Sequence, residues 1–341
     1  MKKFIPAISV VIPMYNAEKY IGECLESIFA QTFQDFEVIV VDDCSTDNSC
    51  AVVEKYSDDK LKLIRRKFNS GYPGIPSNIG MKIACGEYIF FMDNDDLITK
   101  TAFEEMYSIA KKFDADVVAC EKYFQFNDDD IKNFYITSYP SVKFVTEPTL
   151  ITENFAERVT DLQHARFLWN MWSKLIRRNY LIENAIEFIN AMAQDVTFTC
   201  CLICSAEKFV RVPNIINFYR VISSSLQHQY NPNDVRKRIN LWINFLFESF
   251  NCLKKFLNSL KNFQDQPNLK YVVQNIIVGE SVSHLLPIYQ QIPAFQLDKI
   301  IRDELAKFDN KDALTAFIFN RMNIFNINLI QQQQMIQQLQ K

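Results

Sequence analysis

The sequence contains no run of about 20 uncharged apolar residues, the length that a helix needs to cross a bilayer. No membrane-spanning helix is therefore predicted. Lys2 and Lys3 lead directly into a strand pattern without an apolar core, so we expect no signal peptide either. We expect a cytoplasmic protein whose contact with membranes is at most peripheral, at the inner face.

The sequence also lacks an excess of charge of one sign. Its 37 Lys and Arg stand against 40 Asp and Glu, a formal net charge of −3, which gives no indication of a nucleic-acid partner. The acidic excess lies in residues 1–231, and residues 232–341 are mildly basic. With 341 residues, 48% of them hydrophobic, the chain is typical of a soluble globular protein of about two domains.

No disulfide framework is indicated. The nine cysteines are an odd number and most lie in apolar segments, which favours buried free thiols in a reducing compartment. Cys200, Cys201 and Cys204 resemble half a zinc site, but no second Cys/His pair with suitable spacing follows. We therefore interpret these three thiols as part of a helix core.

A buried strand followed by acids is the most informative feature that is present. Residues 88–92 are apolar or aromatic, and Asp93, Asp95 and Asp96 follow directly. Because burying unpaired carboxylates is costly, these acids must face water or a cation at the carboxyl end of the strand. A solvated turn before a helix capped by Thr99 is one interpretation. Ligands of open α/β sheets bind at this edge, which favours a Mg²⁺ or Mn²⁺ site.

Strand and helix patterns alternate over the first 120 residues. This alternation predicts an α/β fold with a doubly wound, mainly parallel sheet. Asn16 is placed to cap the first helix, and Tyr15, Asp42 and Asp43 are expected at the same sheet edge as the acids after residue 92. The expected strands are 8–12, 36–41, 61–65, 88–92 and 116–120, and the expected helices are 17–31, 45–56, 77–85 and 101–113.

Three motifs occur in order: ISVVIPMYN at 8–16, VVDDCSTD at 40–47 and GEYIFFMDNDD at 86–96. Together they resemble family-2 inverting glycosyltransferases of the A-type fold, over about residues 5–225. We accordingly expect a catalytic domain and a C-terminal helical region. The expected divisions are a nucleotide-sugar-binding half at 1–122, an acceptor half at 123–230, and a helical domain or tail at 231–341.

The resemblance implies transfer of a sugar from a nucleotide-diphosphate sugar, expected to be UDP-linked, to a hydroxyl of a glycan or lipid-linked acceptor in cell-surface polysaccharide synthesis. It also implies a Mn²⁺ or Mg²⁺ cofactor that neutralises the leaving diphosphate. By position, the resemblance assigns nucleotide-sugar binding to Pro13, Tyr15, Asp42, Asp43, Asp93, Asn94 and Arg220, and metal binding to Asp95, with Asp93 and Asp96 around it.

The resemblance makes Asp195 the base that accepts the proton of the acceptor hydroxyl. Helix N-capping is the alternative role for Asp195. Two positions depart from the family pattern: Ser77 stands where relatives usually have Arg, and Gln194 stands in place of Glu. These departures leave open a catalytically weakened sugar-nucleotide-binding or scaffolding protein of the same fold. A phosphatase with the first Asp of Asp-x-Asp as nucleophile is disfavoured, because the motif follows the fourth strand rather than the first.

Other segments carry weaker signals. Trp169 and Trp172, three residues apart, are expected on one helical face, where core packing is favoured over a sugar-stacking platform. Arg220 and His228 are candidates for a phosphate clamp or lid. The acidic run 128–130 is interpreted as a solvated loop tip.

The last third of the chain is predicted to be helical. Its apolar stripe packs on the catalytic domain, or its charged face, with Lys254, Lys255 and Lys261, contacts an anionic membrane surface. The Gln-rich segment 331–340 continues a helix, pairs with another chain in a homodimer, or frays, and the sequence leaves these alternatives open.

Overall fold

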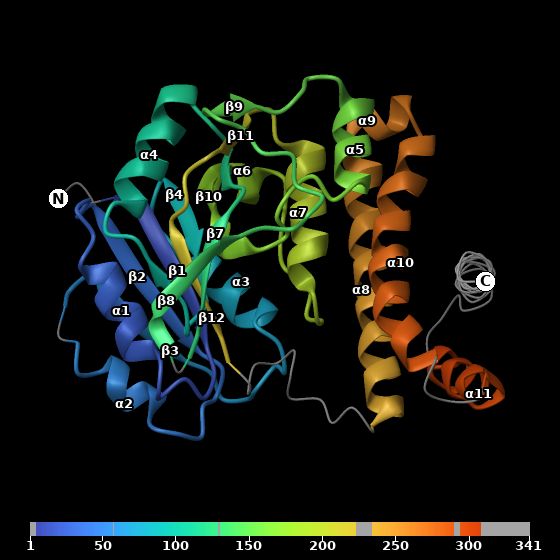
Figure 1. Cartoon of the computed structure of the whole chain (residues 1–341), viewed down its shortest axis with the longest axis horizontal. Helices are drawn as coiled ribbons and strands as arrows, with labels where there is room; N and C mark the ends of the chain where they lie inside the picture. The colour runs from blue at the N-terminus through green and yellow to red at the C-terminus, as the bar shows by residue number, and fades with distance from the viewer. Residues whose placement is uncertain (1–4, 57, 129, 223–233, 290–293, 308–341) are drawn as a thin grey trace, which may run out of the picture.

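The computed structural model describes residues 5–56, 58–128, 130–222, 234–289 and 294–307. Helices cover both faces of a large sheet, and a group of long helices lies along one side (Figure 1). The predicted α/β fold with a doubly wound sheet and a C-terminal helical region is thereby confirmed. His228 and the Gln-rich segment 331–340 lie outside the described residues.

The large sheet has eight strands, and most neighbouring pairs are parallel. They are β1 (Ile8–Met14), β2 (Phe36–Asp42), β3 (Leu61–Arg65), β4 (Tyr88–Phe91), β6 (Val117–Cys120), β9 (Thr149–Leu150), β10 (Lys174–Arg177) and β11 (Phe209–Val212). Their order across the sheet is β3-β2-β1-β4-β10-β6-β11-β9. β10 runs antiparallel to both of its neighbours, and β9 runs antiparallel to β11.

Two hydrophobic cores lie on the two faces of this sheet, because successive strand residues point to opposite faces. Val10 packs on the side of α1 (Ile21–Phe29) and α4 (Ala102–Phe113). Val11 packs on the side of α3 (Gly74–Ile83) and α7 (Gln194–Ser205). β1 and β2 are buried along their whole length, which explains their continuous apolar sequences.

The segment predicted as a helix around Trp169 and Trp172 has a different structure. Met171–Ser173 form a single 3₁₀ turn (η1), and the next four residues form β10 between β4 and β6. The two tryptophans therefore share no helical face, although Trp172 is buried. The prediction was wrong because a short apolar run does not distinguish a helix from a strand, and the pairing partners that decide it are distant in sequence.

The first helix is shorter than predicted because the chain turns at Asn16. This residue has a positive φ of 48° and does not cap α1. Its side-chain oxygen instead accepts the Thr46 N–H at 2.8 Å. The bond joins the loop after β1 to the loop before α2 (Ser49–Val53), and both loops lie at the sheet edge where the acids are expected.

A second sheet of four strands lies beside the large one. In the order β5-β12-β7-β8, it contains β5 (Leu97–Ile98), β12 (Asn217–Val221), β7 (Tyr123–Asn127) and β8 (Asp130–Thr137). β5 follows the acidic run after β4 directly, and β12 carries Arg220. Pairing of these two strands brings Arg220 to the acids.

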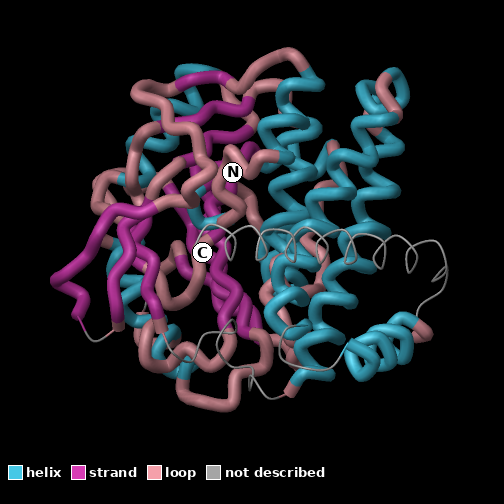
Figure 2. Tube along the Cα trace, turned by 45° about the vertical axis from the view of Figure 1, so that its right-hand side comes forward, coloured by secondary structure: helices cyan, strands magenta, loops and turns pink. Residues whose placement is uncertain are grey.

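The long helices share a core with the large sheet. The remaining helices are α5 (Phe155–Gln163), α6 (Arg178–Glu183), α8 (Val235–Ser259), α9 (Lys261–Asp265), α10 (Asn268–Tyr289) and α11 (Ala294–Leu305). α8 and α10 lie side by side next to α5 and α7 (Figures 1 and 2). Phe245 of α8 and Ile277 of α10 belong to the same core as Val11 of β1. The division at residue 230 stays a prediction.

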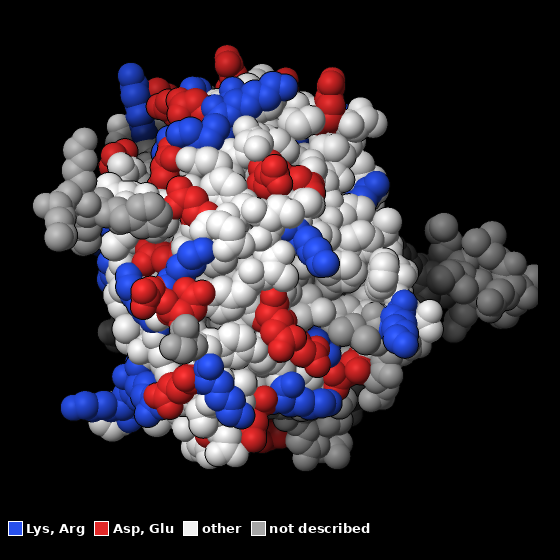
Figure 3. All heavy atoms as spheres, turned by 90° about the vertical axis from the view of Figure 1, so that its left-hand side faces the viewer, with Lys and Arg blue, Asp and Glu red and all other residues white. Residues whose placement is uncertain are grey.

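Lysines predicted on the charged face of the C-terminal region, Lys254, Lys255 and Lys261, are exposed, and their contact with a membrane stays a prediction. None of the helices in the described ranges combines the length and apolar character that crossing a membrane requires. Basic and acidic side chains are interspersed on the face over α1, α2 and α4 (Figure 3).

Gly86, just before β4, is packed against the backbone of β1. A Cβ at this position would lie 2.6 Å from Ser9 N and 2.8 Å from the carbonyl carbon of Ile8. We expect Gly86→Ala to lower the free energy of unfolding by about 1–3 kcal/mol, because relief of the clash requires the strand to shift. The melting temperature of the variant measures this loss of stability. In the control, Gly279→Ala in α10, the new Cβ meets nothing within 4 Å, so stability should stay level or rise by up to ~1 kcal/mol.

Candidate active site

The carboxyl ends of three adjacent strands meet at one edge of the large sheet. Met14 of β1 pairs with Asp42 of β2, and Val11 pairs with Phe91 of β4, two residues before Asp93. Asp42 and Asp93 therefore flank the end of β1 on opposite sides. Two strand spacings separate them by roughly 10 Å. The structure thus brings together the two groups of acids that the sequence assigns to one edge.

Both acids at the end of β2, Asp42 and Asp43, are buried and already hydrogen-bonded within the protein. Asp42 accepts the Ser45 N–H at 3.2 and 3.3 Å from its two oxygens. Asp43 forms an ion pair with Arg66 and accepts the Ser70 N–H at 2.9 Å and its hydroxyl at 2.7 Å. These bonds hold the loops around the strand ends in place. Direct contact of either acid with a nucleotide stays a prediction.

Three further predicted donor-binding residues lie at the same edge. Tyr15 follows β1 with 45% of its surface exposed, so its ring is accessible for stacking. The carbonyl of Pro13 accepts a hydrogen bond from Asn94 Nδ2 at 2.9 Å. This bond fixes the acidic turn after β4 against the end of β1.

The acids after β4 occupy different depths. Asp93 is exposed, Asp95 is half-buried and Asp96 is 0% exposed. Although Asp93 keeps an exposed surface, desolvation by the surrounding protein, followed by the charges of Asp95 and Asp195, raises its pKa. Desolvation also raises the pKa of Asp95. Burial, then Asp95 and Asp93, raises the pKa of Asp96 strongly. Carboxyls that disfavour one another's ionisation form a site that a cation would stabilise.

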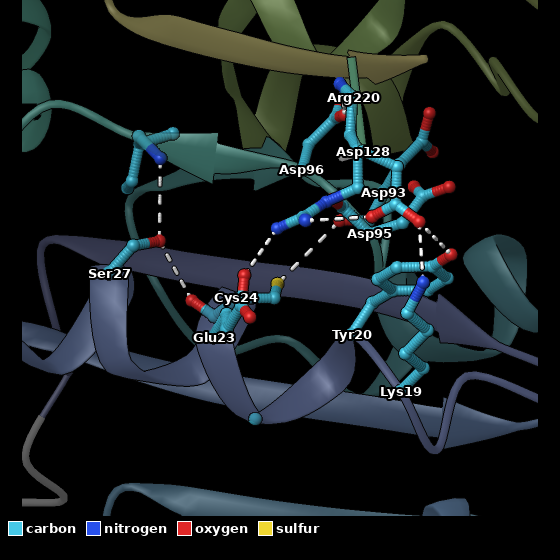
Figure 4. A network of polar contacts seen from close by, with 12 residues as sticks. Lys19, Tyr20, Glu23, Cys24, Ser27, Asp93, Asp95, Asp96, Asp128 and Arg220 are labelled. Atoms are coloured by element: carbon cyan, nitrogen blue, oxygen red, sulfur yellow. Dashed lines mark hydrogen bonds and ion pairs between the residues drawn. The ribbon is translucent and has the colours of Figure 1, made fainter. Parts of the chain in front are cut away.

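Arg220 lies between this acidic run and α1 (Figure 4). Its backbone N–H donates to Asp96 Oδ1 and its Nε donates to the Asp95 carbonyl, both at 2.9 Å. Its two terminal nitrogens form ion pairs with Glu23 and Asp128, and its side chain is only 4% exposed. The guanidinium is therefore not open to a diphosphate in this structure. A phosphate clamp at Arg220 would require these ion pairs to separate.

Asp128 is part of the same network, contrary to its interpretation as a solvated loop tip. Besides Arg220, it pairs with Lys19 and accepts the Tyr20 hydroxyl at 3.0 Å. β7, which ends at the preceding residue, pairs with the strand that carries Arg220. The local run of acids in the sequence gives no sign of this strand pairing, so the interpretation of Asp128 as part of a solvated loop tip was wrong.

Asp93 and Asp95 are the carboxylates that suit a divalent cation. Within the described ranges, neither side chain forms an ion pair, whereas Asp96 is turned toward the Arg220 backbone. Mg²⁺ is commonly held by one or two carboxylates together with substrate phosphates, so this pair fits. The described part of the chain contains no cluster of three or more metal-ligating His, Cys, Asp or Glu side chains. Any bound ion would therefore depend on oxygens of the diphosphate.

Asp195 lies across a pocket from Asp93. The pocket has an empty volume of about 270 Å³ including its open mouth. Asp195 Oδ2 accepts the Met171 N–H at 3.3 Å, and the residue does not cap α7, whose N-cap is Ala193. Burial raises the pKa of Asp195 to about 6, although Lys174 and the Met171 N–H act in the opposite direction. The lining residues are Pro13, Pro73, Ser77, Phe91, Met92, Asp93, Met171, Trp172, Phe188, Gln194 and Asp195.

Both departures from the family pattern face this pocket. The Ser77 hydroxyl donates to the Pro73 carbonyl at 2.7 Å. Gln194 is 7% exposed, and its Oε1 has no hydrogen-bond partner in the described part of the structure. A buried, unpaired acceptor thus lies beside Asp195.

Lys174 is a residue that the sequence interpretation overlooked. It is the first residue of β10, and burial lowers its pKa to about 7, although the negative charge of Asp195 acts in the opposite direction. A lysine inside the apolar run of residues 168–176 was the available signal, because a charge in a buried strand requires partners.

Comparison with known proteins identifies the framework of this site. The sequence profile described as "Glycosyl transferase family 2" matches residues 9–201, which is more than half of the chain. The chain belongs to glycosyl transferase family 2. The resemblance drawn from the three motifs is thus confirmed, and the matched region includes all the strand-end acids and Asp195.

Relatives of this family-2 chain are themselves described as glycosyltransferases. It is 30% identical over 230 residues to "Uncharacterized glycosyltransferase EpsJ" of Bacillus subtilis, covering 65% of this chain and 63% of EpsJ. It is 44% identical over 113 residues to "Poly(ribitol-phosphate) beta-N-acetylglucosaminyltransferase TarS" of Staphylococcus aureus, covering 32% of this chain and 20% of TarS. The chain thus matches less than two thirds of the length of these relatives.

A solved structure supports the same fold. The structure of S. aureus TarS 1-349 in complex with UDP is similar with a TM-score of 0.53 and 28% identity, over 70% of this chain and 65% of that one. The family-2 chain therefore has the A-type glycosyltransferase fold.

Removal of the Arg220 charge should destabilise the protein. Arg220→Met leaves Glu23, Asp128 and the acidic run without their shared cation, at an expected cost of about 3 kcal/mol in unfolding free energy. Chemical denaturation measures the change. The matched control is Arg65→Met, because the Arg65–Glu54 pair is more than half exposed and should contribute only about 0–1 kcal/mol. Equal losses in the two variants would contradict a special role for Arg220.

Proposed function

We propose that this family-2 glycosyltransferase is metal-dependent and inverting. It moves a sugar from a UDP-sugar to a hydroxyl of a glycan or lipid-linked acceptor in cell-surface polysaccharide synthesis. The observation that carries the proposal is the pocket lined by Pro13 at the end of β1, Asp93 after β4 and Asp195 on α7. TarS, which shares 44% identity over 113 residues, is named for transfer of N-acetylglucosamine to poly(ribitol-phosphate), and one of its structures contains UDP.

The donor would bind along the strand ends. Tyr15 is accessible to stack on the base, and Asp42 and Asp43 hold the loops beside it. A Mn²⁺ or Mg²⁺ ion held by Asp95 and Asp93 would supply positive charge to the departing diphosphate. Asp96 supports this turn through its bond with the Arg220 backbone rather than facing the ion.

Asp195 would complete the reaction from the acceptor side. As the acceptor oxygen forms its bond with the anomeric carbon, its proton passes to an Asp195 oxygen. The bond between the anomeric carbon and the diphosphate oxygen breaks, and UDP leaves with the electron pair. The attack comes from the face opposite the leaving group, so the configuration inverts. The Met171 N–H holds one carboxylate oxygen of Asp195 in place for this step.

A scaffolding protein of the same fold is the alternative. It is favoured by the neutral Gln194 and Ser77 in the pocket and by the engagement of Arg220 with Glu23 and Asp128. Binding of UDP in the presence of Mn²⁺, without any release of UDP from UDP-sugars, would support this alternative.

Loss of the proposed base should stop transfer without loss of donor binding. We expect Asp195→Asn to lower kcat by about 10²–10⁴-fold while the affinity for UDP stays within a few fold. UDP release from UDP-glucose, UDP-galactose and UDP-N-acetylglucosamine measures turnover. Normal turnover by Asp195→Asn would refute the assignment.

The activity of the unmodified protein should rise with pH through about 6. The base must be ionised, and burial raises the pKa of Asp195 to about 6, so protonation below that pH removes the active form. At one pH unit below the pKa, kcat should be about tenfold below its plateau. Circular dichroism at each pH separates this loss from unfolding.

Cation-dependent nucleotide binding should require Asp95. In wild-type protein, Mn²⁺ should increase the thermal stabilisation by UDP, and Asp95→Asn should remove that increase. Asp96→Asn is the comparison, because it replaces a buried carboxyl with a neutral group of nearly the same shape. Binding by Asp96→Asn should remain dependent on Mn²⁺. A loss in both variants would mean that Asp96 also binds the ion.

A further inference from the structure

Lys174 is a buried lysine behind the turn that holds the proposed base. It is 1% exposed, and its Nζ donates to three consecutive backbone carbonyls, those of Leu168 at 2.8 Å, Trp169 at 3.3 Å and Asn170 at 2.6 Å. An ammonium has three donors and no acceptor, so the three carbonyls suit its charged form. A neutral amine would direct its lone pair at one of these oxygens.

The turn held by Lys174 also holds Asp195. The three carbonyls immediately precede Met171, whose N–H donates to Asp195 Oδ2 at 3.3 Å. Thr199 of α7 donates to the Trp169 carbonyl at 2.9 Å, so the turn is also fixed to the helix that carries Asp195. A change in the position of the ammonium would therefore move the N–H that orients the carboxylate.

A buried lysine at this place needs an explanation, because an unpaired ammonium is expensive to bury and an apolar residue would pack better. The charged groups around it are few. In the described part of the chain, Asp195 and the Cys120 thiol raise the pKa of Lys174, and Asp195 in turn acts electrostatically on Asp93 and Tyr139. Apart from Lys174, none of these groups contributes positive charge to Asp195.

We propose that Lys174 is a positioning residue for Asp195: its Nζ fixes the turn at residues 168–171, which presents the Met171 N–H to the carboxylate, and its positive charge favours the ionised carboxylate. This inference rests on the proposed role of Asp195 as the base. Lys174 itself touches neither substrate nor reacting atoms.

The test compares Lys174→Met, Asp195→Asn and the double variant. The assay measures UDP release with water as acceptor. The donor is the one among UDP-glucose, UDP-galactose and UDP-N-acetylglucosamine that the wild-type protein turns over. Lys174→Met should lower kcat by about 10–100-fold and leave KM for the donor within threefold. In the Asp195→Asn background it should cause less than a twofold further loss, because it acts through Asp195. Independent, multiplicative losses would overturn the inference.

The pH profile separates the charge from a general packing effect. Without the Lys174 charge, the pKa of Asp195 should rise, so the acid limb of Lys174→Met should move to higher pH. Thr199→Val is the matched control, because it removes a bond to the same turn without removing charge. Its acid limb should stay in place. A profile for Lys174→Met that coincides with wild type would overturn the inference.

A further measurement does not depend on the folding of a Lys174 variant. Side-chain NMR of the lysine ammonium groups should show the Lys174 pKa falling when Asp195→Asn removes its counter-charge. An unchanged Lys174 pKa would overturn the inference. Full activity of Asp195→Asn would instead refute the proposed base, whatever Lys174 does.

Discussion

Repulsion between carboxyls at the end of β4 is the constraint around which this site is built. Asp93, Asp95 and Asp96 lie within four residues, and burial followed by the charge of Asp95 raises the pKa of both Asp93 and Asp96. The compensating cation, Arg220, comes from β12, more than a hundred residues later, and it also binds Glu23 of α1 and Asp128 after β7. One guanidinium thus joins the edge of the large sheet, the small sheet and α1.

Because of this arrangement, the acids at the sheet edge have different roles. Asp96 and the backbone of Asp95 are used to hold Arg220, so Asp93 and Asp95 are the side chains that we propose for a cation and its diphosphate. After β2, Asp43 is similarly engaged with Arg66 and Ser70. Several acids that the sequence assigns to ligand binding therefore shape the loops that surround the ligand.

Insertion of β10 between β4 and β6 connects the two sides of the pocket. The strand carries Lys174 into the interior, and the turn before it presents the Met171 N–H to Asp195. Asp195, the proposed base, is thereby supported by the same sheet whose edge carries Asp93. The C-terminal helices pack behind α7 and share its core, so they support the helix that carries Asp195 in its first turn.

The sequence alone determined the strand and helix alternation up to residue 120, the strand-end acids, the family, and the residues at which this chain departs from it. These follow from local patterns, because apolar runs and the residues that end them are contiguous in the chain. The tertiary structure alone decided the antiparallel β10, the burial of Arg220 among Glu23, Asp95, Asp96 and Asp128, and the position of Lys174 behind the turn that orients Asp195. Charges that meet from distant segments leave no periodic signal, since their partners are fixed only when the strands pair.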